Sequence, residues 1–201
     1  MNKISKVQLS FLVVAMAAVL TVSGCSESPN QANSDAAAPP APTPQATTPG
    51  MTAALTPEQA GAQYHLQTEP TLAQDGQVIR AVVSITNSGK VAVNSRGTLP
   101  VNLGVSVIDA SGAMVTRDFV RASLPLDGIP VGGSADVVAE VPSKDVIGKG
   151  LRFGMVQEGV AWYSDLNVPA LDYGVLTACE DQGRQTICGK DGKPLATAAA
   201  Q

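Results

Sequence analysis

Aromatic side chains are scarce in this chain of 201 residues: they make up 3% of it, and Trp162 is the only tryptophan. There is one histidine, His65, and there are three cysteines. The sequence contains no nucleophile-elbow motif, no phosphate-binding glycine loop and no cluster of metal-ligating residues. Because catalysis needs such groups to converge, we expect a protein that is not an enzyme and holds no metal or cofactor.

Charge is also sparse. Charged residues make up 15% of the chain, and the formal net charge is −4. A net-acidic chain lacks the basic surface that nucleic-acid binding requires, so no nucleic-acid partner is expected. The length leaves room for one modest domain with appended segments rather than two full cores.

Long apolar runs are missing too. The main one covers residues 11–22, which is too short for a permanent membrane-spanning helix. It follows Lys3 and Lys6, and a charged start before a short apolar core is typical of a signal peptide. We assign residues 1–24 to this signal, whose removal takes the formal net charge from −4 to −6.

The signal ends in Val-Ser-Gly-Cys, residues 22–25, which resembles the lipobox of bacterial lipoproteins. The resemblance implies that Cys25 becomes the mature N-terminus and carries a diacylglycerol and a further acyl chain such as palmitate. Two or more acyl chains hold a protein stably on a bilayer. In lipoproteins of this kind, Ser26 implies transfer to the outer membrane. The sequence does not distinguish a domain on the periplasmic face from one on the surface face. The alternative is an ordinary secretory signal that leaves a free thiol.

Residues 25–55 are rich in Ala, Pro, Ser and Thr and have almost no large apolar side chain. Such a segment cannot bury enough surface to offset the entropy of ordering. We expect a disordered tether with a reach of about 30 Å. It leads to a folded domain over residues 56–170.

Within that domain, short runs of Val, Ile and Leu alternate with Gly, Asn, Asp and Pro, which predicts strands separated by turns. The expected fold is all-β: an immunoglobulin-like antiparallel β-sandwich of about seven to eight strands. The candidate strands cover residues 63–68, 77–87, 101–109, 113–117, 119–124, 135–141, 151–157 and 160–168.

Trp162 lies just after the turn signal Glu158-Gly159. A two-residue hairpin loop there would pair Met155 with Trp162 on an apolar face and place Tyr163 on the opposite, solvated face. This register assigns structural roles to Trp162, Met155 and Gly159, with the indole as a pin between two sheets. Tyr163 and Glu158 become candidate binding residues. The alternative is that Trp162 is an exposed ligand platform.

Residues 100–165 also resemble small immunoglobulin-like modules of bacterial cell-surface polysaccharide machinery. The segments that carry the resemblance are Leu103-Gly104, Asp109 to Gly112, the Arg121 to Pro125 stretch, and Val-Gln-Glu-Gly followed by Trp162. It implies a polysaccharide as a possible ligand and adds Arg121 to the candidate binding residues. Asn102 departs from the pattern, since a basic residue is common before the leucine.

Cys179 and Cys188 enclose a polar loop in the C-terminal extension, residues 171–201. Beyond the inner membrane disulfides persist, and closing a loop of this size contributes about 2.5–3 kcal/mol. We therefore predict a disulfide here, followed by a disordered tail over residues 193–201.

These observations favour a membrane-anchored envelope lipoprotein whose sandwich is a non-catalytic binding or assembly module for a polysaccharide or an envelope protein. The alternative is a structural, accessory lipoprotein in which the domain serves as a spacer within a larger envelope complex.

Overall fold

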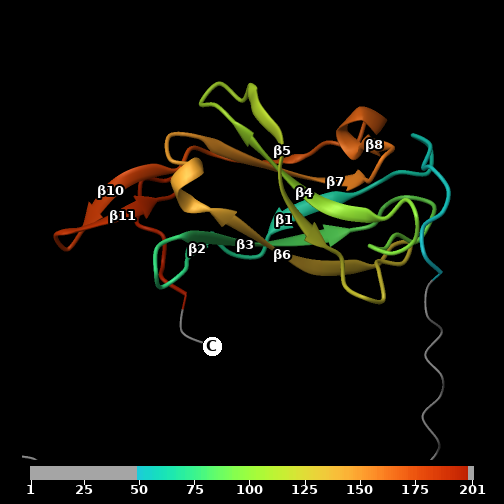
Figure 1. Ribbon diagram of the computed structural model, residues 1–201, viewed down its shortest axis with the longest axis horizontal. Coiled ribbons are helices and arrows are strands. Elements are labelled where there is room, and N and C mark those ends of the chain that lie inside the picture. The colour runs from blue at the N-terminus through green and yellow to red at the C-terminus, as the bar shows by residue number, and fades with distance from the viewer. Residues whose placement is uncertain (1–48, 199–201) are drawn as a thin grey trace, which may run out of the picture. The chain divides into compact units, whose positions relative to one another are not determined.

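A computed structural model describes residues 49–198 of the chain. These residues form strands joined by turns and two short 3-10 helices (Figure 1). The strands are β1 (Gln63–Leu66), β2 (Thr71–Leu72), β3 (Val78–Thr86), β4 (Val101–Ile108), β5 (Met114–Ser123), β6 (Ser134–Pro142), β7 (Gly150–Gln157), β8 (Ala161–Trp162), β9 (Leu171–Tyr173), β10 (Thr177–Asp181) and β11 (Arg184–Cys188), and the helices are η1 (Ser143–Asp145) and η2 (Tyr163–Leu166).

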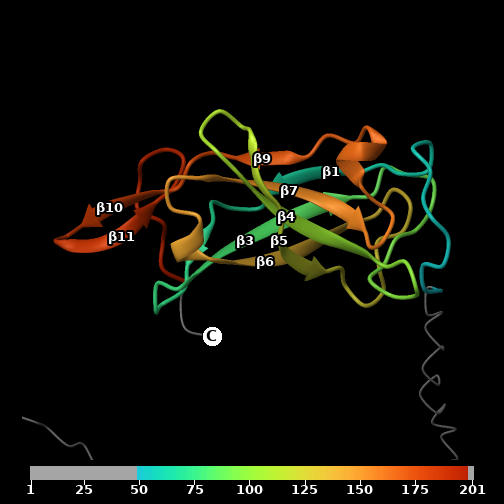
Figure 2. The same ribbon diagram turned by 45° about the horizontal axis from the view of Figure 1, so that its top comes forward.

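Two antiparallel sheets face each other (Figure 2). In the four-stranded sheet, β3 pairs along its whole length with β6 and on its other side with β1 and β2. In the five-stranded sheet the order is β5-β4-β7, and β8 and β9 pair with opposite ends of β7. Strands β10 and β11 form a separate hairpin that extends from one end of the body.

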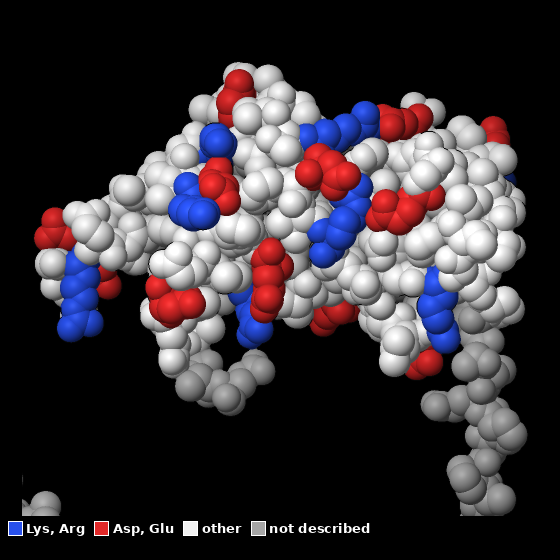
Figure 3. Space-filling model, viewed as in Figure 1, with Lys and Arg blue, Asp and Glu red and all other residues white. Residues whose placement is uncertain are grey.

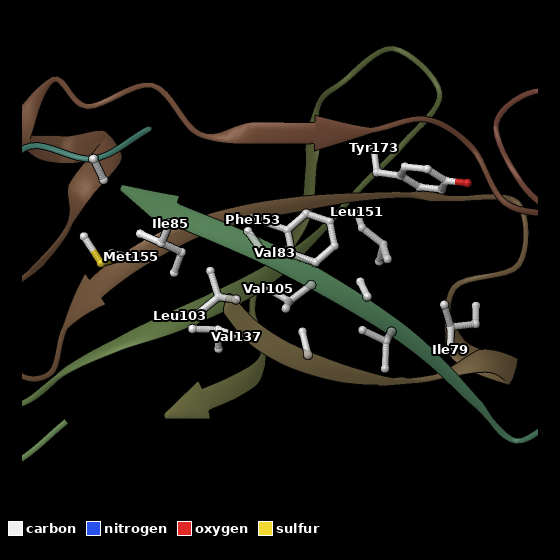
Figure 4. Packing of buried hydrophobic residues seen from close by; sticks show 14 of the residues in the cluster. Ile79, Val83, Ile85, Leu103, Val105, Val137, Leu151, Phe153, Met155 and Tyr173 are labelled. Atoms are coloured by element: carbon white, nitrogen blue, oxygen red, sulfur yellow. The ribbon is translucent and has the colours of Figure 1, made fainter. Parts of the chain in front are cut away.

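The core lies between the two sheets and is mainly aliphatic (Figure 4). Alternate residues of β3 point inward, as the period of two in a strand requires. The fully buried side chains that meet between the sheets include Ile79, Val83, Ile85, Leu103, Val105, Leu151, Phe153 and Met155. Burying each such side chain contributes about 1.5–3 kcal/mol.

The prediction of an all-β antiparallel sandwich is therefore confirmed. The structure has more strands than the seven to eight expected, because two- and three-residue strands such as β2 and β9 are too short to leave a recognisable sequence pattern. Two candidate strands, 113–117 and 119–124, are one strand, β5. The candidate strand 160–168 is wrong beyond Trp162, where η2 begins.

The folded body begins earlier than the predicted start at residue 56. Residues 49–55, which we call the N-terminal strap, lie along the loop that follows β3. The backbone of Met51 bridges Gly97, and the buried side chain of Gln157 accepts a hydrogen bond from Leu55 N (2.8 Å) and donates one to Ala53 O (2.9 Å). An amide buried at the end of β7 needs these partners, which is why the last residues of the expected tether are ordered. Residues 1–48 lie outside the described part of the chain.

The C-terminal extension is also part of the body. Strand β9 completes the five-stranded sheet, and a disulfide joins Cys179 to Cys188 as predicted. The expected disordered tail instead packs as far as Ala198, whose N–H donates to Leu72 O (2.8 Å), because Leu195 finds a buried position beside β11. Residues 199–201 lie outside the described range.

Among residues 49–198, no helix has the length and apolar character needed to cross a membrane.

Candidate functional site

The hairpin that carries Trp162 has a different register from the predicted one. Val156 pairs with Trp162 and Gln157 with Ala161, so the loop has three residues, 158–160. Gly159 takes a positive φ of 71°, consistent with the turn role assigned to it, but Val160 joins the loop and its N–H donates to Gln157 O. A shift of one residue moves every side chain to the other face. The predicted Met155–Trp162 pair is therefore wrong, and Trp162 lies on the outer face of the sheet.

Tyr163 takes the interior position instead. It opens helix η2, turns under the sheet and is 1% exposed, so it offers no surface to a partner, contrary to the prediction. Burial raises the pKa of its phenol, with the neighbouring Tyr64 adding to the shift. Met155 is fully buried in the core, as its structural role requires, although its neighbour is not the indole.

The indole of Trp162 fits a notch in the sheet. A Cβ atom at Gly104 would lie 2.5 Å from the ring, so only glycine allows this approach. The guanidinium of Arg121 lies 4.5 Å from the ring centroid and that of Arg117 lies 5.6 Å from it. The half-buried ring thus packs against a strand backbone and two cations, an arrangement that cation–π attraction favours. It is neither an inter-sheet pin nor an open platform.

Glu158 completes this arrangement from the hairpin loop. Its Oε1 accepts hydrogen bonds from Arg121 Nε (3.0 Å) and from Asn102 Nδ2 (2.8 Å). Two of the predicted binding residues, Arg121 and Glu158, are therefore brought together. Asn102, which stands where a basic residue was expected, contributes a neutral donor. We call Asn102, Gly104, Arg117, Arg121, Glu158 and Trp162 the Trp162 cluster.

An irregularity in β5 brings Arg117 into the cluster. Val105 pairs with Val120 but Val107 pairs with Thr116, so residues 117–119 bulge opposite a single residue of β4. Arg117 lies within the bulge, and its guanidinium pairs with Asp165 of η2. The sequence gives no simple signal for such a bulge, which explains why Arg117 was missed.

A shallow groove of about 570 Å³ adjoins the cluster on the same face. The Arg117–Asp165 pair borders it on one side and the Arg152–Asp172 pair, with an N–O distance of 2.7 Å, borders it on the other. Pro169 and its neighbours add apolar surface. Figure 3 shows Lys and Arg side chains beside Asp and Glu side chains across the visible surface, with no large area of one sign. The groove therefore offers many hydrogen-bonding groups with balanced charge.

His65 lies elsewhere, exposed on β1 of the four-stranded sheet. Within residues 49–198, no group of three or more His, Cys, Asp or Glu side chains is arranged to hold a metal ion.

No protein-family model, no curated protein and no solved structure matches this chain. What the protein does has to be inferred from its own residues.

Proposed function

We propose that the protein is an envelope lipoprotein, anchored in the outer membrane through acylated Cys25, whose sandwich is a non-catalytic binding module. The lipobox and the preceding signal-like segment support the anchor, and Ser26 supports the outer membrane as its destination. Both lie outside the described residues. The binding role rests on the Trp162 cluster and the groove beside it.

The observation that carries the binding role is the placement of the only tryptophan on the outer face of a sheet, among planar polar side chains. Tryptophan and arginine are the residues most enriched where proteins bind partners. A half-buried indole presents an apolar edge, while guanidinium, carboxylate and amide groups around it donate and accept hydrogen bonds.

The balance of charge narrows the class of partner. Arg117, Arg121 and Arg152 are each paired with a carboxylate, so no surplus positive charge awaits an anion. A neutral polyhydroxylated chain can accept from the arginines, donate to the carboxylates and lay its C–H faces on apolar surface. The groove volume falls in the usual range for small-ligand sites, about 300–1,000 Å³. A polysaccharide of the cell envelope is therefore the partner that we favour.

A binding titration tests this proposal. Full-length lipidated protein in detergent would be titrated with polysaccharide prepared from the envelope of the producing cells, and the fluorescence of Trp162 would be followed. Glu158→Gln removes the charge that holds Arg121 and Asn102, so we expect the affinity to fall about tenfold or more, as loss of a charge-assisted hydrogen bond implies.

Asp191→Asn is the control, because Asp191 pairs with Lys190 beyond β11 and belongs neither to the Trp162 cluster nor to the groove. It should bind like the unmodified protein. If the unmodified protein binds no polysaccharide but is cross-linked to an envelope protein through this face, the partner class is wrong. If both variants lose affinity equally, the site is wrong.

A spacer role is the second candidate. It is favoured by the same pairing of charges, because a cluster whose members satisfy one another also serves as a brace. Deleting residues 26–48, while keeping the strap, separates the two roles. Polysaccharide binding should survive this deletion, whereas a function that depends on distance from the membrane should be lost.

A further inference from the structure

The connection between β5 and β6 contains two successive tight turns of similar sequence, Pro-Leu-Asp-Gly at 125–128 and Pro-Val-Gly-Gly at 130–133. In each, the N–H of the final glycine donates to the carbonyl of the proline, at 2.8 and 2.9 Å. The second position of each turn is apolar and exposed: Leu126 is 81% exposed and Val131 is 56% exposed. Turn positions are usually polar, so two apolar tips in succession call for an explanation.

The tips are held in place by the body of the domain. Between the two turns, Ile129 is fully buried and exchanges backbone hydrogen bonds with Val93 (2.8 and 3.0 Å). The second turn is tied to the end of β3, because Asn87 N donates to Gly133 O and Gly132 N donates to Asn87 O. Leu126 and Val131 are therefore presented on a fixed support at one end of the sandwich.

The N-terminal strap arrives at the same end. A single residue, Arg96, connects the two features: its carbonyl accepts a hydrogen bond from Met51 N (2.8 Å), and its guanidinium donates to Leu126 O. Met51 is only two residues from the first described residue, so the chain that leads back to Cys25 leaves the body beside the Leu126 turn. In Figures 1 and 2 the strap and the loops beside the start of β6 lie at the end opposite the β10–β11 hairpin.

We propose that this end of the sandwich rests on the bilayer interface, with Leu126 and Val131 among the lipid headgroups. The inference rests on the proposed lipid anchor. A chain of formal charge −6 after signal removal is not drawn to anionic lipid, so the contact is apolar. Two apolar side chains alone would not hold a protein on a membrane. The sequence of residues 26–48 predicts a tether with a reach of about 25–30 Å, which would make the contact intramolecular and supply the high effective concentration that it needs.

An environment-sensitive dye tests the inference. Leu126→Cys and, separately, Ile147→Cys would be labelled with a nitrobenzoxadiazole dye in the full lipidated protein, whose Cys25 is acylated and whose other cysteines form a disulfide. Ile147 is the matched control: it is 43% exposed and follows β6, which starts beside the turns and runs for nine residues, about 30 Å, to the other end. Both proteins would be incorporated into vesicles of phosphatidylethanolamine and phosphatidylglycerol.

We expect the dye at position 126 to shift its emission to the blue and to be quenched by spin-labelled lipid, and the dye at position 147 to behave as in water. Val131→Cys should behave like Leu126→Cys. If the protein sediments with the vesicles but the dyes at 126 and 147 give the same aqueous spectrum, the interface contact is wrong and the anchor stands. If the protein does not sediment with the vesicles, the anchor itself fails, and this inference fails with it.

Discussion

The layer between the two sheets and the outer face of the five-stranded sheet use aromatic side chains differently. Between the sheets, Tyr64 reaches from β1 to β7, where its hydroxyl accepts a hydrogen bond from Met155 N (3.0 Å). Tyr173 donates to Glu69 Oε2 (2.8 Å), and Tyr163 is buried. On the outer face, Trp162 contacts glycine and arginine and remains half-exposed.

The difference follows from how β7 is paired. Strand β9 covers residues 151–153 of β7 and β8 covers residues 156–157, so the N–H of Met155 lies in a gap between the two partners. A buried N–H must be satisfied, and a phenol is long enough to reach it from the opposite sheet. The indole of Trp162 satisfies no buried backbone group of this kind in the described part of the chain. The tyrosines therefore stabilise the fold from inside, whereas the tryptophan packs at the surface within the Trp162 cluster.

Truncating the buried ring should have the largest effect. Tyr163→Ala removes a side chain that is 1% exposed, and we expect a loss of about 3–5 kcal/mol in the free energy of unfolding. Trp162→Ala removes a half-exposed ring and should cost about 1–2 kcal/mol. Urea denaturation followed by circular dichroism measures both. A larger loss for Trp162→Ala would reverse the comparison.

Filling the notch beneath Trp162 should have the next largest effect. Gly104→Ala places a methyl group 2.5 Å from the indole, and such overpacking costs about 1–3 kcal/mol. Gly154 pairs directly with Gly104, but a methyl group there would meet only Ala170, at an ordinary 3.5 Å. Gly154→Ala should therefore change stability by no more than about 0.5 kcal/mol. Equal effects of the two substitutions on urea denaturation and Trp162 emission would show that the ring does not occupy the notch.

Removing single hydroxyl groups tests the inner layer on a finer scale. Tyr64→Phe leaves the buried Met155 N–H without its partner and should cost about 1–2 kcal/mol, since Tyr64 itself is only partly buried. The hydroxyl of Tyr163 has no hydrogen-bond partner among residues 49–198, so Tyr163→Phe should be neutral or slightly stabilising. Thermal unfolding of the two variants gives the comparison. A greater loss for Tyr163→Phe would contradict it.

Ionisation of the tyrosines, which an alkaline titration follows, should have the smallest effect on stability near neutral pH. Burial, followed by the hydrogen bond to Glu69, raises the pKa of Tyr173 to about 12, from an ordinary value of 10.0. Burial also raises the pKa of Tyr64 and of Tyr163. Because folding favours the protonated phenol, the contribution of Tyr173 is complete below pH 10 and is lost as the pH rises through about 12. Tyrosinate absorbance should therefore stay low at pH 10 in the folded protein and rise together with unfolding. Three tyrosines that ionise at pH 10 without unfolding would place them outside the core.

The sequence predicted the sandwich because alternating apolar residues in β3, β4, β6 and β7 produce a strong signal. It did not predict the β7–β8 register. Gly159 suits a two-residue and a three-residue loop equally well, and Val160 looks like a strand residue by its own propensity. A tertiary contact decides the register: Glu158 N donates a hydrogen bond to Pro100 O (2.9 Å) and so holds the loop. An error of one residue in the predicted register placed Trp162 and Tyr163 on the wrong faces of the sheet.

The candidate site was predicted in part for a related reason. Arg121 and Glu158 were both proposed, and the structure joins them. Gly104 and Asn102 appeared only as positions in a resemblance, since a glycine in a strand does not say which ring will cover it. Arg117 depends on the bulge in β5, and a bulge is set by the pairing of two strands rather than by either sequence alone.

The strap also decides what proteolytic shedding would release. Gln157 draws two of its three side-chain hydrogen bonds from residues 53 and 55, and its third, to Leu99 O, holds the neighbouring loop. A protease that cuts ahead of residue 49 would free an intact domain. A cut just beyond Leu55 would leave buried amide atoms unsatisfied, at about 1–3 kcal/mol for each group, and would liberate a weakened product that is easily degraded further.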